Sequence, residues 1–319
     1  MTGPAASDRA LAAPRCPICM SPDVASPQIH RDRRRGLPGD WSFWECANCT
    51  LFFQYPMPTL VELQDYYAGY TGVVGSSDGL SIGSRYDMLR RLYHRISGDV
   101  DPRDFIPVTP GLRILDYGCG AAPYLHYFRS RGALVHGAEI EPSVVRSHRA
   151  SGLDVALIEN PETIPFPDGA FDIVYLMQVI EHVPAPHHLL REVRRILQPS
   201  GEVYLAMPNA RSIWRRRFGA DWVVGWFAPF HLFVFSLRSI RALAAANGFA
   251  VVRWWSSTPE SWFRLNLHAR LHPENNLLGD AATTWLDTWP PRVLLGAALR
   301  LRELFARERD CLVVRLRKC

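Results

Sequence analysis

The chain has no run of about 18 uninterrupted apolar residues, the length at which a membrane-spanning helix is expected. Its first residues also lack the charged region followed by an apolar core that marks a secretory signal. No internal repeat or low-complexity tract is evident. We therefore expect a folded, cytoplasmic protein.

An excess of charge of one sign is also lacking. The 319 residues include 36 Lys plus Arg against 31 Asp plus Glu, a net charge of +5, and much of the excess lies in short runs at 31–35 and 215–217. This balance argues against a nucleic-acid partner. With 48% hydrophobic residues, the chain can bury one full domain with a smaller appendage, or two domains.

Cysteine is sparse and unevenly placed. Four of the seven cysteines form two Cys-x-x-Cys pairs, Cys16 with Cys19 and Cys46 with Cys49. Four thiolates in two such pairs suit a closed tetrahedral zinc site, which leaves no open position for a substrate. Two redox-active or unligated pairs are the alternative. We expect residues 16–58 to form a small zinc ribbon whose folding free energy comes from the metal.

The segments beside the ribbon are less regular. Residues 1–15 are rich in Ala, Pro and small polar types, so we expect a disordered arm. Residues 59–98 are expected to form a helical linker and lid. Within them, the Gly/Ser-rich segment 71–84 is typical of a mobile loop that closes over a cofactor.

The most informative run is Ile-Leu-Asp-Tyr-Gly-Cys-Gly-Ala-Ala at 114–122. Gly118 and Gly120 let the backbone approach a ligand where a buried strand turns sharply into a helix. About 20 residues later, Glu139 ends another apolar segment, where a carboxylate can accept hydrogen bonds from both hydroxyls of a ribose. Asp116 would repel a pyrophosphate but would attract an ammonium or sulfonium group, which S-adenosylmethionine carries.

With this motif the chain resembles the class I S-adenosylmethionine-dependent methyltransferases, whose first motif reads roughly acidic-x-Gly-x-Gly-x-Gly. Residues 165–172, 179–183 and 197–207 are similar to the family's segments around its fourth and fifth strands, and the resemblance covers about residues 82–257 plus a final strand. Two departures are Ala122 in place of the third glycine and Ser200 where the family usually has Gly.

The resemblance, with strand-like and helical segments in alternation, predicts an α/β fold. We expect a Rossmann-like seven-stranded methyltransferase sheet with helices on both faces, over residues 99–319, with insertions at about 209–235 and 259–308. The expected strands are 113–116, 134–139, 153–157, 171–177, 202–207, 250–255 and, by resemblance antiparallel, 311–316.

The same resemblance implies which residues bind the cofactor. Asp116, Gly118 and Gly120 would lie along its methionine end. Glu139 would bind the ribose and Asn160 the adenine, with further contacts from Ile140 and Gln178. The simpler alternative is that the glycines form only a strand-to-helix turn and that Glu139 is a solvated strand end.

Residues just after the fourth and fifth strands are expected to face the methyl group. His182 has a suitable pKa for a general base, but it could equally cap the following helix. In the ubiquinone-pathway O-methyltransferases, which this region resembles, an acid three residues before the Glu-His pair helps to hold a divalent metal. Gln178 stands there in this chain, which argues against a Mg2+-assisted mechanism.

His231 is a second candidate for the catalytic base. It lies among the aromatic residues between 214 and 235, which are similar to a segment that forms part of the acceptor wall in many relatives. An aromatic-lined pocket with one titratable His is a reasonable acceptor site. The alternative, of equal weight, is that these aromatics are core and His231 is a buried structural histidine.

The insertion at 259–308 contains a helical pattern over 293–305 with arginines on the opposite side. An ordinary helix that packs on the domain is the favoured interpretation, and peripheral membrane contact through 293–309, for a lipid-linked acceptor, is the alternative.

Together these features predict a methyltransferase that uses S-adenosylmethionine and carries a structural zinc. The expected acceptor is a small molecule, a sugar or a lipid-linked intermediate, and oxygen is the expected site of methylation. The alternatives are a zinc-ribbon-containing RNA base methyltransferase and a non-catalytic, cofactor-binding regulatory protein. Too few Lys and Arg interleave the aromatics at 214–235 for a groove that tracks a nucleic-acid strand.

Overall fold

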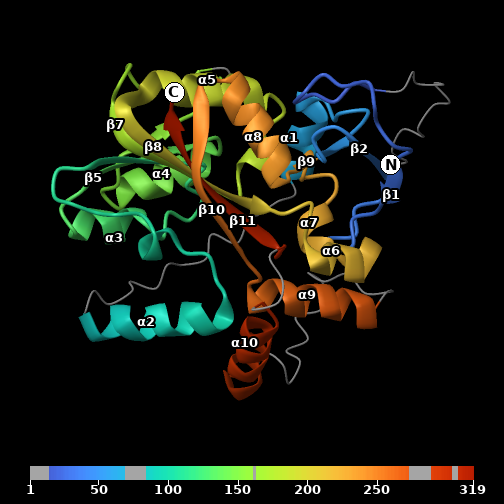
Figure 1. Ribbon diagram of the computed structural model, residues 1–319. Helices are drawn as coiled ribbons and strands as arrows, with labels where there is room; N and C mark the ends of the chain where they lie inside the picture. The colour runs from blue at the N-terminus through green and yellow to red at the C-terminus, as the bar shows by residue number, and fades with distance from the viewer. Residues whose placement is uncertain (1–13, 69–83, 161–162, 273–288, 304–307) are drawn as a thin grey trace. The chain divides into compact units, whose positions relative to one another are not determined.

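The chain folds into two compact units, each assembled from separated stretches of sequence (Figure 1). Unit 1 comprises Met1–Gly69, Pro208–Leu243 and Ser256–Leu312, and unit 2 comprises Tyr70–Met207, Ala244–Trp255 and Val313–Cys319. This structure, a computed structural model, describes residues 14–68, 84–160, 163–272, 289–303 and 308–319. The expected arm at 1–15 and the expected lid at 71–84 lie almost wholly outside these ranges.

Most of unit 2 is built on a seven-stranded sheet with the order β10-β11-β8-β7-β4-β5-β6. β4 pairs in parallel with β5 and β7, β5 with β6, and β7 with β8. The predicted α/β sheet is thus confirmed, with a strand at each expected position. The strands are β4 (Arg113–Tyr117), β5 (Leu134–Glu139), β6 (Val155–Leu157), β7 (Phe171–Met177), β8 (Leu197–Pro208), β10 (Phe249–Ser257) and β11 (Cys311–Lys318).

Helices connect the parallel strands, as crossover connections require. The clearest is α5 (Pro186–Ile196), which begins at a proline. Its buried apolar residues recur at a spacing of three and four residues, which places them on one face: Leu189, Leu190, Val193 and Ile196. The helices outside the ribbon and the insertions are α2 (Ser84–Ser97), α3 (Leu125–Ser130), α4 (Pro142–Ala150), α5 (Pro186–Ile196) and α8 (Leu237–Ala246), with single 3-10 turns η1 (Pro102–Asp104) and η2 (Ile180–His182).

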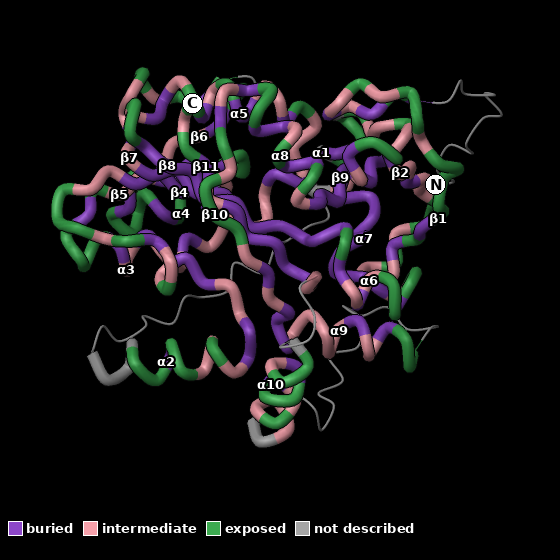
Figure 2. The backbone as a smooth tube through the Cα atoms, in the orientation of Figure 1, coloured by how far each residue is buried: buried purple, intermediate pink, exposed green. Residues whose placement is uncertain are grey.

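The central strands of this sheet are buried on both faces. Ile114 and Leu115 on β4 are fully buried, as are Val174, Tyr175 and Leu176 on β7. Strands covered on both faces are read in the sequence as continuous apolar runs, which is why these segments were predictable. Figure 2 shows the same contrast along the backbone, with buried central strands and a largely exposed α2.

Unit 1 contains a second sheet, of four strands in the order β1-β2-β3-β9. β1 (Gln28–His30), β2 (Trp41–Glu45) and β3 (Phe52–Gln54) come from the expected zinc ribbon, whereas β9 (Phe233–Val234) comes from the first insertion. The remaining elements of the unit are α1 (Leu60–Ala68), α6 (Ile213–Phe218), η3 (Gly219–Asp221), α7 (Val223–Trp226), α9 (Glu260–Leu271) and α10 (Trp289–Glu303).

One aromatic cluster forms the core of unit 1. Trp214, Trp222 and Trp226 are buried in it together with Phe43 and Phe52 from the ribbon strands. For these three tryptophans the structure therefore supports a core role rather than a pocket lining.

α10 contributes to the same core. Leu299 is 4% exposed in the cluster, and the Arg302 guanidinium lies 4.7 Å from the centre of the Trp214 ring. The favoured interpretation, an ordinary packed helix, fits these contacts. Across the ranges that the structure describes, no helix is both long and apolar enough to cross a membrane.

Gly225 should be intolerant of any side chain. A Cβ there would lie 1.9 Å from a ring carbon of Trp222, which is fully buried. We expect Gly225→Ala to lower the free energy of unfolding by about 1 to 3 kcal/mol, the usual cost of overpacking, measured by thermal or urea denaturation. In a Trp222→Leu background the same substitution should cost less, because the ring is gone. An equal cost in both backgrounds would contradict this account.

Candidate cofactor and metal sites

The loop after β4 turns the chain through three residues of positive φ. Gly118 (φ 74°) and Gly120 (φ 49°) adopt this region easily, and Ala122 (φ 50°) adopts it despite its Cβ. A Cβ on Gly118 would lie 2.7 Å from Cγ2 of Val179, whereas one on Gly120 would meet no described atom within 4 Å. Packing therefore requires glycine at 118, while the backbone at 120 lies open to a ligand.

Two buried side chains anchor this loop. Cys119 and Ala122 are buried in a cluster with Leu125 and Val145, so they point into the core and away from the open side. The Gly120 carbonyl accepts a hydrogen bond from Nε2 of His148, at 2.6 Å. His148 was not predicted from the sequence, because it lies on α4, 28 positions away, and belongs to no motif.

Glu139, the last residue of β5, connects its strand to this loop. Its Oε2 accepts the Gly120 N–H at 2.9 Å, and its Oε1 accepts the N–H groups of Ile140 and Glu141 at 2.7 and 3.2 Å. A carboxylate has about four acceptor positions, so one remains on Oε2 for a hydroxyl group. Glu139 is therefore a buried, backbone-bound acceptor rather than a solvated strand end.

Asp116 lies near the end of β4 and is 3% exposed. Burial, and then the negative charge of Glu139, raise the pKa of Asp116 to about 7. A cationic ligand beside this carboxyl would favour its ionised form. Of the other predicted cofactor residues, Ile140 is 64% exposed, an unusual exposure for a large apolar side chain, and Asn160 is exposed.

The segment after β7 contains the predicted Gln178 and His182. Gln178 has a φ of 57°, a strained conformation for a residue with a Cβ, and its N–H donates to the Ala206 carbonyl at 2.8 Å. His182 is half-buried at the end of η2. Because β7 pairs with β4, this segment and the Gly118 loop follow neighbouring parallel strands.

Glu181, the acidic member of the Glu-His pair noted in the sequence, lies in the same segment. It is fully buried, and neither carboxylate oxygen has a hydrogen-bond partner among the described residues. Burial raises the pKa of Glu181 to about 8, so the side chain is mostly neutral at pH 7. A buried carboxyl without a partner is typical of a functional site. The Glu-His pair marks this position in the sequence, and the apolar residues around it, Val179, Ile180 and Val183, indicate its burial.

The four predicted metal ligands come together in unit 1. The Sγ atoms of Cys16 and Cys49 are 3.5 Å apart, those of Cys19 and Cys46 are 3.6 Å apart, and all four lie within 4.8 Å of one another. Tetrahedral zinc with Zn–S bonds of about 2.3 Å requires sulfur atoms about 3.8 Å apart. The cluster therefore has the composition and size of a four-cysteine zinc site.

His231, the second predicted base, also belongs to unit 1. Its ring is 5% exposed, and Nδ1 lies 2.8 Å from the Gly225 carbonyl. Since a carbonyl can only accept, Nδ1 carries the proton and the lone pair of the neutral ring is on Nε2. A role in catalysis stays a prediction for both His231 and His182.

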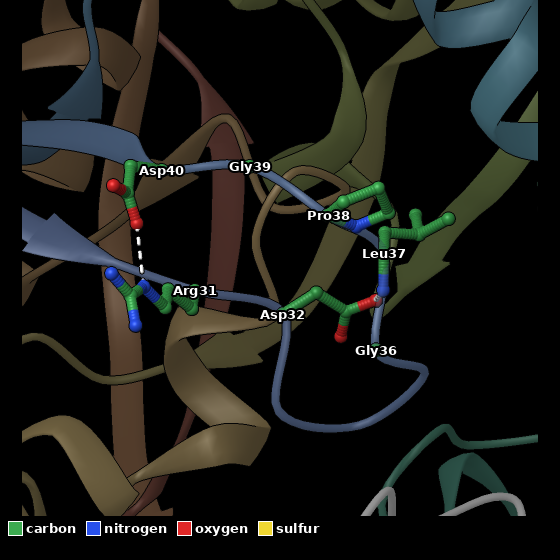
Figure 3. A pocket seen from close by; sticks show the side chains of 7 residues that line it. All are labelled: Arg31, Asp32, Gly36, Leu37, Pro38, Gly39 and Asp40. Carbon is green, nitrogen blue, oxygen red and sulfur yellow. Dashed lines mark hydrogen bonds and ion pairs between the residues drawn. The ribbon is translucent and has the colours of Figure 1, made fainter. Parts of the chain in front are cut away.

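A shallow hollow of about 370 Å³ lies in the ribbon loop (Figure 3). Its lining is Arg31, Asp32 and residues 36–40, with Arg31 paired to Asp40 at 2.7 Å. None of the predicted cofactor or metal residues lines it.

The parallel sheet with its helical crossovers defines a Rossmann-like protein. Residues 84–253, more than half of the chain, match the model of the family described as "Methyltransferase domain", and the chain belongs to that family.

Curated relatives match only part of the chain. The 27-O-demethylrifamycin SV methyltransferase of Amycolatopsis mediterranei is 29% identical over 123 residues, 36% of this chain and 43% of that protein. The ubiquinone biosynthesis O-methyltransferase of Xanthomonas oryzae pv. oryzae is 31% identical over 105 residues, 31% of this chain and 44% of that protein. The chain thus spans less than half the length of these relatives.

A solved structure, that of the 4+2 cyclase SpnF, is 22% identical to the chain. The alignment covers 82% of this chain and 97% of the SpnF chain, with a TM-score of 0.48. This likeness is too loose to bear on function.

The raised pKa of Glu181 predicts a pH-dependent effect of Glu181→Gln. At a pH between 4.5, the usual pKa of a glutamate, and about 8, its pKa in the folded protein, Glu181 is protonated in the folded state and ionised in the unfolded state. In this window, a rise of one pH unit therefore lowers the free energy of unfolding of the native protein by up to about 1.4 kcal/mol. Glutamine does not titrate, so the Gln variant lacks this dependence. Urea unfolding at pH 5 and pH 8 should show the variant gaining relative stability as pH rises. A pH-independent difference between the two proteins would refute the assignment.

Proposed function

We propose that this protein transfers a methyl group from S-adenosylmethionine to a small-molecule, sugar or lipid-linked acceptor, at an oxygen atom, in the cytoplasm. The observation that carries the proposal is the loop after β4, in which an open Gly120 backbone lies between a buried Asp116 and the backbone-bound Glu139. Membership of the methyltransferase family supports it.

Each residue of this site has a distinct role in the proposal. Asp116 attracts the cationic methionine end, and Glu139 accepts a ribose hydroxyl at its remaining position on Oε2. Ile140 offers an exposed apolar surface on which adenine can pack, with Asn160 as a polar contact. Gly120 keeps the loop free of a side chain that would occupy the ligand's space.

The cofactor supplies an electrophilic methyl group on a sulfonium sulfur. In the proposed reaction the acceptor oxygen forms a bond to this carbon as the S–CH3 bond breaks, which yields S-adenosylhomocysteine, and the acceptor proton passes to a base. We propose His182, which follows β7, as that base, and His231 as the alternative.

The printed names of the two curated relatives, one acting on a rifamycin and one in ubiquinone biosynthesis, support a small-molecule acceptor. The name of the second, an O-methyltransferase, supports oxygen as the methylated atom. The four cysteines are proposed to hold a structural zinc, since their number leaves no position for a substrate.

Calorimetric titration of the purified protein with S-adenosylmethionine and with S-adenosylhomocysteine tests the function. We expect Glu139→Ala to weaken binding of both by about 10- to 100-fold, through the lost charge-assisted hydrogen bond and the loosened loop. Asp168→Asn is the matched control, because Asp168 is exposed and precedes β7. If the native protein binds neither ligand, the proposal is wrong.

The pKa of Asp116 predicts how binding depends on pH. Because the folded, ligand-free carboxyl has a pKa of about 7 and the cation favours its ionised form, binding below pH 7 should release a proton. We expect affinity for S-adenosylmethionine to rise from pH 5.5 to pH 7, by at most about tenfold per pH unit. Calorimetry at pH 6 in buffers of different ionisation enthalpy measures the released proton. Asp116→Asn should remove both effects, and proton uptake instead of release would contradict the assignment.

A further inference from the structure

The zinc ribbon shares its sheet with the segment that contains His231. β3 pairs antiparallel with β9, so Phe52 is opposite Val234 and Phe53 is opposite Phe233. One further backbone contact extends the pairing, since the Gln54 N–H donates to the Leu232 carbonyl at 2.9 Å. A two-residue strand has few hydrogen bonds of its own, so the position of β9 depends on β3.

The second cysteine pair is bonded directly to the end of this segment. The Ser236 hydroxyl donates to the Cys49 carbonyl at 3.0 Å and lies 2.7 Å from the Thr50 hydroxyl, 186 positions away in sequence. The turn that presents these groups is part of the metal site, because the Cys49 N–H points to the Cys46 sulfur at 3.4 Å. The turn can hold Ser236 in place only while its own geometry is fixed.

Gln54 provides the strongest link between the two segments. Its side chain is 1% exposed, and its Nε2 donates to the Pro229 carbonyl at 2.9 Å and to the His231 carbonyl at 2.7 Å. Residues 227–232 have no regular secondary structure that would pair these carbonyls within the segment. Buried backbone carbonyls are costly to leave unpaired, so Gln54 takes the place of a strand partner.

The ribbon also packs rings and guanidinium groups against the same segment. The buried carboxylate of Asp32 accepts the N–H groups of Arg34 and Arg35 at 2.9 and 3.0 Å and so shapes their loop. The guanidinium carbon of Arg34 lies 4.0 Å from the centre of the Phe227 ring, and that of Arg35 lies 5.0 Å from the centre of the Phe230 ring. Such contacts are weakly attractive one by one, but here they add to the strand pairing.

His30 of β1 stacks on Trp226 with ring centres 4.0 Å apart. Burial, helped by the charge of Arg215, lowers the pKa of His30 to about 4, so the stacked ring is neutral at pH 7.

We infer that metal binding by Cys16, Cys19, Cys46 and Cys49 holds residues 226–236 in place, and that Gln54 is the positioning residue that transmits this order to His231. The ribbon is too small to order itself without the metal, and the carbonyls of Pro229 and His231 and the strand β9 take hydrogen bonds from the ribbon. The inference that this segment serves the acceptor rests on the proposed function, whereas its dependence on zinc does not.

Hydrogen exchange measured by mass spectrometry on the full-length protein tests the inference. The zinc-loaded protein is compared with the same protein after a chelator has removed the metal, with zinc content measured directly. We expect peptides that cover 226–236 to exchange at least about tenfold faster without zinc, together with those that cover 46–54. Peptides over β4 and β7 should not change. If 46–54 opens while 226–236 keeps its protection, the inference is wrong.

Gln54→Met separates the positioning role from metal binding. This variant keeps the length of the side chain and all four thiols, so we expect one zinc per chain but faster exchange over 226–236. Gln28→Met is the matched control, because Gln28 lies exposed on β1 of the same sheet and should leave exchange unchanged. Unchanged protection over 226–236 in zinc-loaded Gln54→Met would overturn the role of Gln54.

If Gln54→Met loses its zinc, Ser236→Ala is a second variant that tests whether the ribbon holds residues 226–236 in place, by the same exchange measurement. It removes the bond to the Cys49 carbonyl and leaves the ribbon core intact. Binding of S-adenosylhomocysteine, measured on each variant, should match that of the native protein. Absence of binding in every protein would refute the proposed function alone, because the exchange pattern is read without any ligand.

Discussion

The hydrogen bond from the Gly120 N–H to the Glu139 carboxylate adds a side-chain contact to the backbone hydrogen bonds that join the ends of the neighbouring parallel strands β4 and β5. It fixes the position of the loop after β4 relative to the acidic end of β5. The same carboxylate is itself held by two backbone N–H groups, so its orientation does not depend on solvent. The geometry of the proposed cofactor site depends on this bond, since it holds the backbone of Gly120, where a Cβ would meet no described atom within 4 Å, against the end of β5.

The three buried acidic residues, Glu139, Asp116 and Glu181, differ in how their carboxyl groups are satisfied. Glu139 is satisfied by backbone donors, whereas Asp116 and Glu181 are buried where ionisation is costly. A site of this kind favours a ligand that brings positive charge. The strained φ of Gln178, three residues before Glu181 in sequence, fits a region that is shaped for a ligand rather than for stability.

Unit 1 depends on long-range pairing instead. Its aromatic core combines ribbon residues such as Phe43 with Trp222 and Trp226, and its sheet is completed by β9. The first insertion is therefore part of the same folded unit as the ribbon. Asp310 reinforces this unit, because it accepts hydrogen bonds from the Ser212 hydroxyl and from the Trp222 indole N–H.

Much of the fold was predictable from the sequence. The central strands of the main sheet are largely apolar, and a glycine turn with an acidic residue before it is a local signal, so both are visible without tertiary information. Gly118 and Gly120 have positive φ, and their predicted contacts with a cofactor remain predictions. The close approach of the four cysteines was equally accessible from their spacing.

The remaining features depend on contacts between distant residues. β9 has two residues and no periodicity, so neither its existence nor its pairing with β3 could be read locally. His148 and Gln54 act through backbone groups, which leave no pattern in the sequence. The sequence could not distinguish aromatic core from aromatic pocket either, because both have the same composition.

The central claim, that the Gly118–Gly120 loop and Glu139 bind the nucleoside of S-adenosylmethionine, is tested most directly by a crystal structure with S-adenosylhomocysteine bound. The account predicts a ribose hydroxyl on the Glu139 carboxylate, the adenine against Ile140, and the amino acid end near Asp116. A ligand bound elsewhere, with the Glu139 carboxylate making no contact to it, would contradict the account.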